Sequence, residues 1–331
     1  MRVRIESSGR LHMGLIDLHG GLGRKFGSIG VALKEPLLGL EAAPADELQV
    51  EGLEQERTKA FARRFFQRYA PEHRRLSGRG AYLRVFKAIP SHVGFGSGTQ
   101  LALAIGVALM RLYDLDITVA DLAKTIERGR RSGIGIGAFQ HGGFIVDGGS
   151  IVNSHGEETV PPIIFRHPFP ADWLFVVATP QVGAGLSGEA ELTAFHELPP
   201  SSPETVDHIC RILVMKMLPS LIEGKIKPFG EAMTRIQQLV GDNFSDFQRG
   251  RYASIASEQL VAYMLEQGAY GAGQSSWGPT VYGLVRGEEQ AQSLAEAVRS
   301  FVEGKWKSTV FYTAARNEGF YISTSTREAI P

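Results

Sequence analysis

Residues 89–103 read IPSHVGFGSGTQLAL, a glycine-rich turn that runs directly into an apolar segment. Gly94, Gly96 and Gly98 allow the backbone to bend tightly and to approach a ligand closely. The apolar run at 101–112 predicts a buried helix. Because the first amides and the positive dipole end of such a helix favour anions, this segment predicts a phosphate-binding site.

This turn matches neither of two common nucleotide-binding motifs. A P-loop has Lys after its last glycine, whereas Thr99 follows Gly98 here. A dinucleotide-binding motif has the spacing G-x-G-x-x-G, whereas residues 94–98 have G-x-G-x-G. A glycine-rich turn that binds no ligand is the structural alternative.

The composition is typical of a soluble globular protein. The 331 residues, 43% hydrophobic and 21% charged, suit one large or two medium domains. The 35 Lys and Arg balance 35 Asp and Glu, so the net charge favours neither nucleic acid nor a membrane surface as a partner. Cys210 is the single cysteine, which excludes an internal disulfide. Since no segment looks like a signal peptide or a membrane span, we expect a cytoplasmic protein.

The hydrophobic patterning predicts an α+β protein with a first domain at 1–160 and a second at 161–331. The elements expected in the first domain are strands at 2–9, 29–33 and 81–89, helices at 55–70, 101–112 and 118–129, and a glycine-rich loop with a hairpin at 130–153. The arginines of the helix at 55–70 are expected on a solvated face.

The second domain begins with a predicted buried strand at 173–180. The elements expected after it are helices at about 204–223, 228–240 and 251–267, a strand at 280–285, a helix at 288–302 and a strand at 308–315. This order predicts an antiparallel sheet with helices on one side.

Three motifs resemble the GHMP kinase superfamily. They are S-G-R-L-H at 8–12, P-x-x-x-G-x-G-S-G at 90–98 and a G-A-G turn at 271–273. The second motif of that superfamily usually reads P-x-x-x-G-L-G-S-S-A, from which Gly98, Thr99 and Gln100 depart. The resemblance implies an N-terminal phosphate-loop domain like ribosomal protein S5 and a ferredoxin-like C-terminal domain.

With these departures, the sequence resembles one branch of the superfamily, the β-ribofuranosylaminobenzene 5′-phosphate synthases. The motifs that carry this resemblance, between about residues 5 and 317, are SSGRLHMGLIDLHG, RKFGSIGVAL, SHVGFGSGTQLALA, RRSGIGIGAFQHGGFIVDGG and GAGQSSWGPTVYG. The resemblance implies a decarboxylating C-ribosyl transfer at the start of tetrahydromethanopterin biosynthesis. It joins 4-aminobenzoate to 5-phosphoribosyl 1-pyrophosphate and releases CO2 and pyrophosphate. The sequence leaves 4-aminobenzoate and 4-hydroxybenzoate open as acceptors.

Two other functions remain alternatives: an ATP-dependent small-molecule kinase and a non-catalytic sensor of a phosphorylated metabolite. Kinases of the superfamily often have an Asp in the loop after P-S-G. No acid lies between Arg131 and Asp147 here, and Ala138 stands near the expected position. C-ribosyl transfer needs no strong base, because the 4-amino group activates the ring carbon. It needs stabilisation of pyrophosphate, alignment of two substrates and exclusion of water.

The candidate site residues follow from these motifs and from the resemblance. The catalytic candidates are Arg10, His12, Asp17 and His141. We expect pyrophosphate to bind at Gly94, Gly96, Ser97, Gly98 and Thr99. The other residues expected to bind substrate are Ser8, Arg24, Ser28, Arg131, Gln140, Asn243, Gly273, Gln274, Ser275, Ser276 and Trp277. Trp277 is the candidate for stacking on the acceptor ring.

Magnesium commonly accompanies pyrophosphate and prefers oxygen ligands. By analogy with superfamily kinases, Thr99 or Ser97 would hold the ion together with Glu127. The alternative for Glu127 is a solvated pair with Arg130 or Arg131. No organic cofactor is expected, and the resemblance implies a homodimer.

Overall fold

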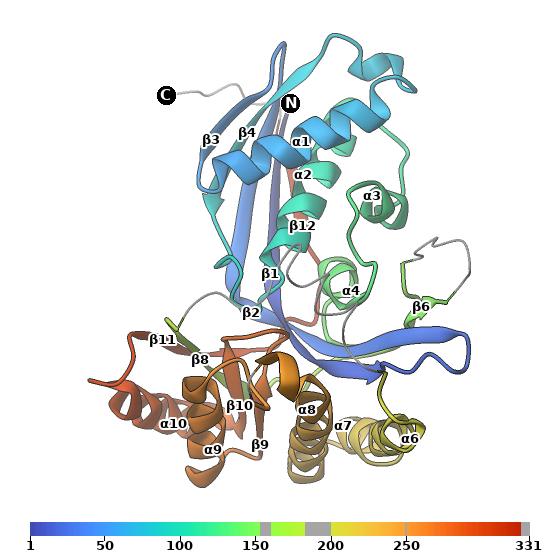
Figure 1. Ribbon diagram of the computed structural model, residues 1–331. Coiled ribbons are helices and arrows are strands. Elements are labelled where there is room, and N and C mark those ends of the chain that lie inside the picture. Colours follow the sequence, from blue (N-terminus) through green and yellow to red (C-terminus); the bar gives the residue numbers. More distant parts are fainter. Residues whose placement is uncertain (153–159, 183–199, 249, 326–331) are drawn as a thin grey trace.

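The computed structural model describes residues 1–152, 160–182, 200–248 and 250–325. Its strands form two sheets, each with helices packed against it (Figure 1). The elements up to residue 170 are β1 (Arg2–Asp17), β2 (Arg24–Ala45), β3 (Gln49–Gly52), α1 (Gln55–Tyr69), β4 (Gly80–Lys87), α2 (Ser97–Tyr113), α3 (Val119–Thr125), α4 (Ile134–Gln140), β5 (Phe144–Asp147), β6 (Ser150–Ile151) and β7 (Ile163–His167).

The remaining elements belong mostly to the second sheet and its helices. They are β8 (Trp173–Pro180), α6 (Pro203–Ile212), α7 (Leu218–Ile222), α8 (Ile226–Gln248), α9 (Ile255–Glu266), β9 (Gly271–Gln274), β10 (Val281–Arg286), α10 (Gly287–Val302), β11 (Ser308–Ala314) and β12 (Tyr321–Ser325). A π-helical segment, Leu213–Met217, joins α6 to α7.

The first sheet has the strand order β12-β1-β2-β4-β3, and β5 to β7 extend it from β2. Helix α2 packs directly on β1 and β2, and α1 lies on α2 (Figure 1). The helix predicted at 101–112 is therefore the buried centre of this half, as its apolar residues require. Thr118 caps α3 by accepting from the amide of Asp121 at 3.1 Å, as an N-cap residue does.

Strands β1 and β2 are much longer than the predicted strands at 2–9 and 29–33. The prediction ended β1 at Gly9 because glycines usually mark loops. Two register shifts in the pairing of β1 with β2 absorb the glycine-rich stretch instead. A Cβ on Gly30 would lie 2.6 Å from the carbonyl oxygen of Leu11. Glycine here permits two strands to lie close together.

Two other glycine-rich segments also differ from their prediction. The loop expected after residue 130 contains helix α4. The G-A-G segment at 271–273 is strand β9, paired with β10, and the turn follows at Ser275. Strand β12 was not predicted.

The second sheet is antiparallel, with the order β11-β8-β10-β9. Helices α9 and α10 cover it, and α8 packs on both β9 and β1 (Figure 1). The predicted α+β class and the antiparallel sheet with helices on one side are confirmed. Strands β7 and β12 follow residue 160 but pair with strands of the first sheet, and the boundary at residue 160 stays a prediction.

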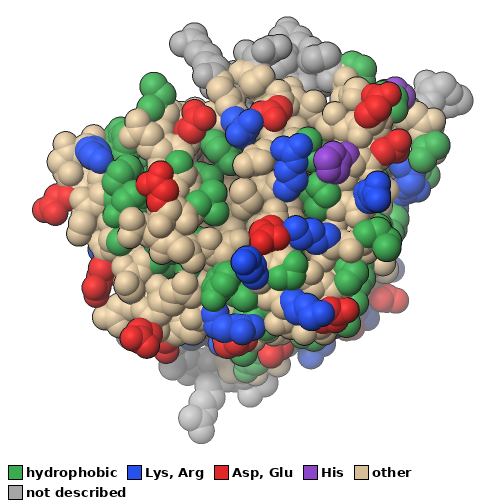
Figure 2. All heavy atoms as spheres, turned by 90° about the horizontal axis from the view of Figure 1, so that it is seen from below, with side chains coloured by type: hydrophobic (Ala, Val, Ile, Leu, Met, Phe, Trp, Pro, Cys, Tyr) green, Lys and Arg blue, Asp and Glu red, His purple; other side chains and the backbone are tan. Residues whose placement is uncertain are grey.

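Charged side chains of both signs are interspersed on the face seen in Figure 2. This distribution agrees with the balanced charge of the sequence. Within the described ranges, no helix is both long enough and apolar enough to cross a bilayer.

Candidate active site

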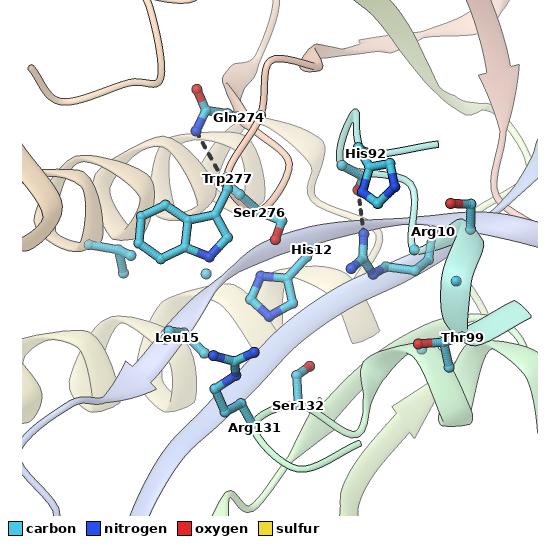
Figure 3. A pocket seen from close by; sticks show the side chains of 18 of the residues that line it. Arg10, His12, Leu15, His92, Thr99, Arg131, Ser132, Gln274, Ser276 and Trp277 are labelled. Carbon is cyan, nitrogen blue, oxygen red and sulfur yellow. Dashed lines mark hydrogen bonds between the residues drawn. The ribbon is translucent and has the colours of Figure 1, made fainter. Parts of the chain in front are cut away.

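A cleft of about 450 Å³ lies where β1, the turn before α2, the segment after α3 and the region around α8 and β9 meet (Figure 3). Strand β1 contributes Arg10, His12 and Leu15 to its wall. In Figure 3, Trp277 and Leu15 lie at one end and Thr99 at the other, with Arg10, His12 and Arg131 between them. The cleft is therefore long enough to separate two kinds of surface.

The turn before α2 forms one end of the cleft. Gly94 and Gly96 have φ angles of 104° and 75°, which side chains rarely tolerate. A Cβ on Gly94 would lie 2.5 Å from the carbonyl oxygen of Ser275. Since Gly96 to Thr99 line the cleft and α2 begins at Ser97, the positive end of this helix faces the cleft.

Arginines dominate the charge of the cleft. Its lining includes six of them: Arg10, Arg57, Arg128, Arg130, Arg131 and Arg251. Glu127 is the single carboxylate in that lining, and it accepts from Arg64 at 2.8 Å and from Arg130 at 3.1 Å. The cleft is thus suited to a ligand with several negative charges.

Arg10 and Ser275 fix the shape of the glycine turn. The Arg10 guanidinium donates to the carbonyl oxygen of Gly94, and its amide donates to that of Phe95 at 3.1 Å. The buried Ser275 hydroxyl donates to Gly94 at 2.7 Å and accepts from the amide of His12 at 3.0 Å. These bonds tie the turn to β1 and to the end of β9.

His12 lies between the two ends with only 8% of its surface exposed. Its carbonyl oxygen accepts from the amide of Ser276 at 3.1 Å, which holds the residue in place. Burial, together with the nearby charge of Arg10, lowers the pKa of His12 from 6.5 to about 3. The ring is therefore neutral near pH 7, able to form hydrogen bonds but not to supply a positive charge.

The other end of the cleft is apolar. Trp277, Phe244, Leu15 and Val240 line it, and the first three are buried together with Leu18. The rings of Phe244 and Trp277 meet edge to face with centroids 4.8 Å apart. This surface suits a flat aromatic ligand.

Known protein families match both halves of the chain. The family model described as GHMP kinases N terminal domain matches residues 57–143, and GHMP kinases C terminal matches residues 217–304. The β-ribofuranosylphenol 5′-phosphate synthase of Archaeoglobus fulgidus is 35% identical over 329 residues, 97% of this chain and 99% of that protein. The synthase of the same name from Methanothermobacter thermautotrophicus is 33% identical over 338 residues, 96% and 98% of the two chains.

The chain belongs to the β-ribofuranosylphenol 5′-phosphate synthase family. It is therefore a member of the GHMP kinase superfamily, as its motifs predicted, and an enzyme of a family named as synthases.

Solved structures show the same fold at low identity. Lactococcus lactis galactokinase complexed with galactose aligns with a TM-score of 0.68 at 14% identity, over 97% of this chain and 95% of that one. Homoserine kinase from Cytophaga hutchinsonii aligns with a TM-score of 0.64 at 16% identity, over 97% of each chain. The predicted two-domain GHMP fold is confirmed.

More than half of the predicted site residues lie together in the cleft of this family member. They are Arg10, His12, Gly94, Gly96, Ser97, Gly98, Thr99, Glu127, Arg131, Gln274, Ser276 and Trp277. Gln274 accepts from the amide of Ala253 at 2.7 Å and donates to the carbonyl oxygen of Ser276 at 3.0 Å, so it also shapes the turn.

The other predicted residues do not line the cleft, and three of them have contacts that explain why. Asp17 accepts from the amides of His19 and Gly20 at 2.7 and 2.8 Å, in the turn between β1 and β2. Arg24 donates to the carbonyl oxygens of Gly148 and Gly149, at 2.7 and 2.8 Å. The Asn243 amide donates to the Ser201 hydroxyl at 2.6 Å.

The rest of these residues are placed by the packing of the fold. Ser8, Ser28, Gly273 and Ser275 are buried. Gln140 ends α4, and His141 follows it at the surface. None of the six is part of the cleft lining within the described residues.

Arg57, Arg128 and His92 line the cleft but were not predicted to do so. Arg57 lies on the helix whose arginines were expected to face solvent. The signal that could have found Arg128 is the run E-R-G-R-R at 127–131, which places three arginines beside a glycine. Clustered arginines around glycine are more typical of anion binding than of a solvated helix face.

Ser97, Thr99 and Glu127, the residues expected to hold magnesium, line the cleft, and their role as ligands stays a prediction. In the described part of the chain, no group of three or more His, Cys, Asp and Glu side chains could hold a metal ion. The Glu127 carboxylate, the expected ligand, is occupied by Arg64 and Arg130. No step below therefore depends on a metal ligand of this chain.

Proposed function

We propose that the chain catalyses a decarboxylating C-ribosyl transfer from 5-phosphoribosyl 1-pyrophosphate to a benzoate with an electron-donating group at C4. The observation that carries this proposal is the two-ended cleft, with an arginine-rich glycine turn at one end and an aromatic surface at the other. Family membership supports it, since the relatives are named for a product with ribofuranose, a 5′-phosphate and a phenol ring.

The donor carries its charge on the 5′-phosphate and on the pyrophosphate. When the bond from C1 to the pyrophosphate oxygen breaks, the electron pair leaves with pyrophosphate and C1 becomes cationic. The guanidinium of Arg10 and the first turn of α2 can stabilise the leaving group as its charge increases. A neutral His12 beside this point adds no positive charge that would oppose the cation at C1.

The acceptor ring fits the apolar end, against Trp277, Phe244 and Leu15. The ring carbon that bears the carboxylate forms the new bond to C1, and the C4 substituent supplies the electron density. Loss of CO2 returns the pair of its carbon–carbon bond to the ring, so no protein base is required. Arg131, which lies between the two ends in Figure 3, can hold the carboxylate before it leaves.

Two acceptors satisfy this chemistry. With 4-aminobenzoate the product would enter tetrahydromethanopterin biosynthesis, as the sequence resemblance implies. With 4-hydroxybenzoate it would be the ribofuranosylphenol 5′-phosphate that names the relatives. We further propose that magnesium arrives with the pyrophosphate, and that the enzyme is a cytoplasmic homodimer.

The test is a turnover assay without ATP. Purified protein, magnesium, 5-phosphoribosyl 1-pyrophosphate and either carboxyl-labelled acceptor are combined, and the released CO2 and pyrophosphate are measured. Equal release of both with one acceptor is the expected result, and the acceptor that reacts decides between the two. No release from folded protein with bound donor would refute the proposal. Subsequent consumption of ATP would then identify a kinase, and binding without turnover a sensor.

A further inference from the structure

Two arginines from distant parts of the sequence meet over the first turn of α2. A Cβ built on Gly98 would lie 3.0 Å from Nη2 of Arg57 and 3.6 Å from Nη2 of Arg128. Arg57 comes from α1, and Arg128 from the segment that follows α3. Since both nitrogens approach one point, a single anionic group at the cleft can contact both guanidiniums.

Separate contacts hold each arginine in this position. Nη1 of Arg57 donates to the Glu54 carboxylate at 2.8 Å and to the Ser91 hydroxyl, which itself donates to Glu54 at 2.9 Å. The guanidinium of Arg128 lies over the Phe61 ring, 5.3 Å from its centroid. Arg57 thus uses one terminal nitrogen for the protein and directs the other toward Gly98.

Two guanidiniums at the positive end of a helix form a site that attracts an anion, although Arg57 also pairs with Glu54. Glycine at position 98 leaves the space that such an anion needs, because even an alanine Cβ would contact Arg57. At Gly96 a different guanidinium lies close: a Cβ built there would be 3.2 Å from Cζ of Arg10. The turn therefore has a cationic group beside Gly96 and two beside Gly98.

A diphosphate has two charged phosphates, and the turn offers cationic groups at two places. We propose that Arg57 and Arg128 bind the distal phosphate of the pyrophosphate group, while Gly96 and Arg10 bind the phosphate next to the ribose. This assignment rests on the proposed function for the identity of the donor. It gives the two arginines a role in stabilising the leaving group, because charge builds on both phosphates when the bond to C1 breaks.

The assignment predicts discrimination between diphosphate and monophosphate. Arg57→Gln and Arg128→Gln should each weaken the binding of inorganic pyrophosphate about tenfold or more, and the double variant about a hundredfold. Binding of inorganic phosphate should change less than about threefold, since it can occupy the Gly96 position alone. Isothermal titration calorimetry in one magnesium-containing buffer measures both ligands.

One further variant is a control, and two others test the same site without removing either arginine. Arg63→Gln removes an exposed arginine of α1 outside the cleft and should leave both affinities unchanged. Gly98→Ala keeps both arginines but fills their shared space, so it should weaken pyrophosphate selectively. Glu54→Gln weakens the hold on Arg57 and should have a smaller effect of the same kind.

Equal loss of pyrophosphate and phosphate binding in the arginine variants, or no loss of either, would overturn the assignment. These titrations involve no turnover, so they separate this proposal from the proposed function. A selective loss of pyrophosphate in a protein that fails the C-ribosyl assay would refute only the reaction. Unchanged pyrophosphate binding in variants of an active enzyme would refute only the arginine assignment.

Discussion

Two glycine-rich segments of this enzyme, the turn at 94–98 and residues 271–273 of strand β9, use the same residue for different purposes. In the turn, Gly94 and Gly96 have positive φ angles and line the cleft. In the strand, the glycines are buried and face other parts of the chain: a Cβ on Gly271 would lie 2.3 Å from the carbonyl oxygen of Gly230 in α8. Both segments require close approach: the strand approaches a helix, and under the proposed function the turn approaches a ligand.

A glycine in the sequence therefore indicates that something lies close to the backbone. It does not indicate whether this is a ligand or another part of the chain. Ser275 connects the two segments, since it follows β9 and its hydroxyl donates to Gly94. Substitutions in the strand should therefore act on stability, those in the turn on ligand binding, and those at the connection on both.

The largest effect is expected in the strand. Gly271→Ala should lower the free energy of unfolding by about 3 kcal/mol, because the methyl group would overlap the backbone of Gly230. The folded fraction should bind pyrophosphate normally. Urea denaturation measures the change, with Gly268→Ala as a control. The control has open space and a φ of 89°, so about 1 kcal/mol is expected from backbone strain alone. Equal losses of stability in the two variants would show that the close contact between Gly271 and Gly230 does not determine the cost.

The second effect is expected in the turn. Gly96→Val should weaken pyrophosphate binding about a hundredfold, which corresponds to about 2.7 kcal/mol. The branched side chain would displace Arg10 and strain a residue whose φ is 75°. The free energy of unfolding should fall by less than in Gly271→Ala. Calorimetry with pyrophosphate decides the matter, and an unchanged affinity would show that the turn does not hold this ligand.

The third effect is expected at the connection. Ser275→Ala should cost about 2 kcal/mol of stability, because the carbonyl oxygen of Gly94 and the amide of His12 lose a buried partner. Pyrophosphate affinity should fall as well, since the turn is less firmly held. Ser276→Ala is the matched control for the loss of stability, because its backbone amide, not its side chain, bonds to His12. If Ser275→Ala changes stability but not affinity, the Ser275 hydroxyl does not couple strand β9 to ligand binding at the turn.

The smallest effect concerns the pH dependence of His12. Since its folded pKa, about 3, is below the ordinary 6.5, its contribution to stability is complete above pH 6.5 and is lost as the pH falls toward 3. Between pH 6.5 and 5.5 the loss should be about 1 kcal/mol, because the unfolded state is already half protonated at pH 6.5, and each unit below that should cost about 1.4 kcal/mol. Urea denaturation at pH 6.5 and 5.5 should show this slope in the native enzyme and not in His12→Gln.

Asp147 makes the stability depend on pH in the opposite direction, so its effect must be distinguished from that of His12. Burial raises the pKa of its carboxyl from 3.8 to about 6, although the amides of Gly149 and Gly133 donate to it. Its contribution to stability is complete below pH 3.8 and is lost as the pH rises through 6. The difference in stability between the native enzyme and His12→Gln is free of the Asp147 contribution, because both proteins retain Asp147. Parallel pH profiles of the two would contradict the neutral state of His12.

The sequence predicted the elements whose pattern is local. Helices α1, α2 and α10 and strand β8 have apolar spacing that fits their length, and each was expected close to its observed position. Helix α4 and strand β9 were not expected, because their glycines are typical of turns when the neighbouring backbone is unknown. The reason for those glycines lies in residues far away in the chain, such as Gly230.

The candidate site shows the same division. The turn at 94–99 was predicted from its own residues, and it lines the cleft with Arg10 and Trp277. Arg57 could not be placed there, since its approach to Gly98 depends on how α1 packs on α2. Asp17 and Arg24 have suitable chemistry in the sequence, but backbone groups of nearby turns occupy them.

The pairing of β12 with β1 has a consequence for biosynthesis. Arg2 to Glu6 of β1 pair with Tyr321 to Ser325, so one edge of the first sheet is completed by residues made more than 300 positions later. A ribosome therefore releases β1 with an unpaired edge and must synthesise about 300 further residues before that edge is covered. Exposed strand edges promote association between chains. The strand that carries Arg10 and His12 thus gains its second neighbour only when β12 has emerged.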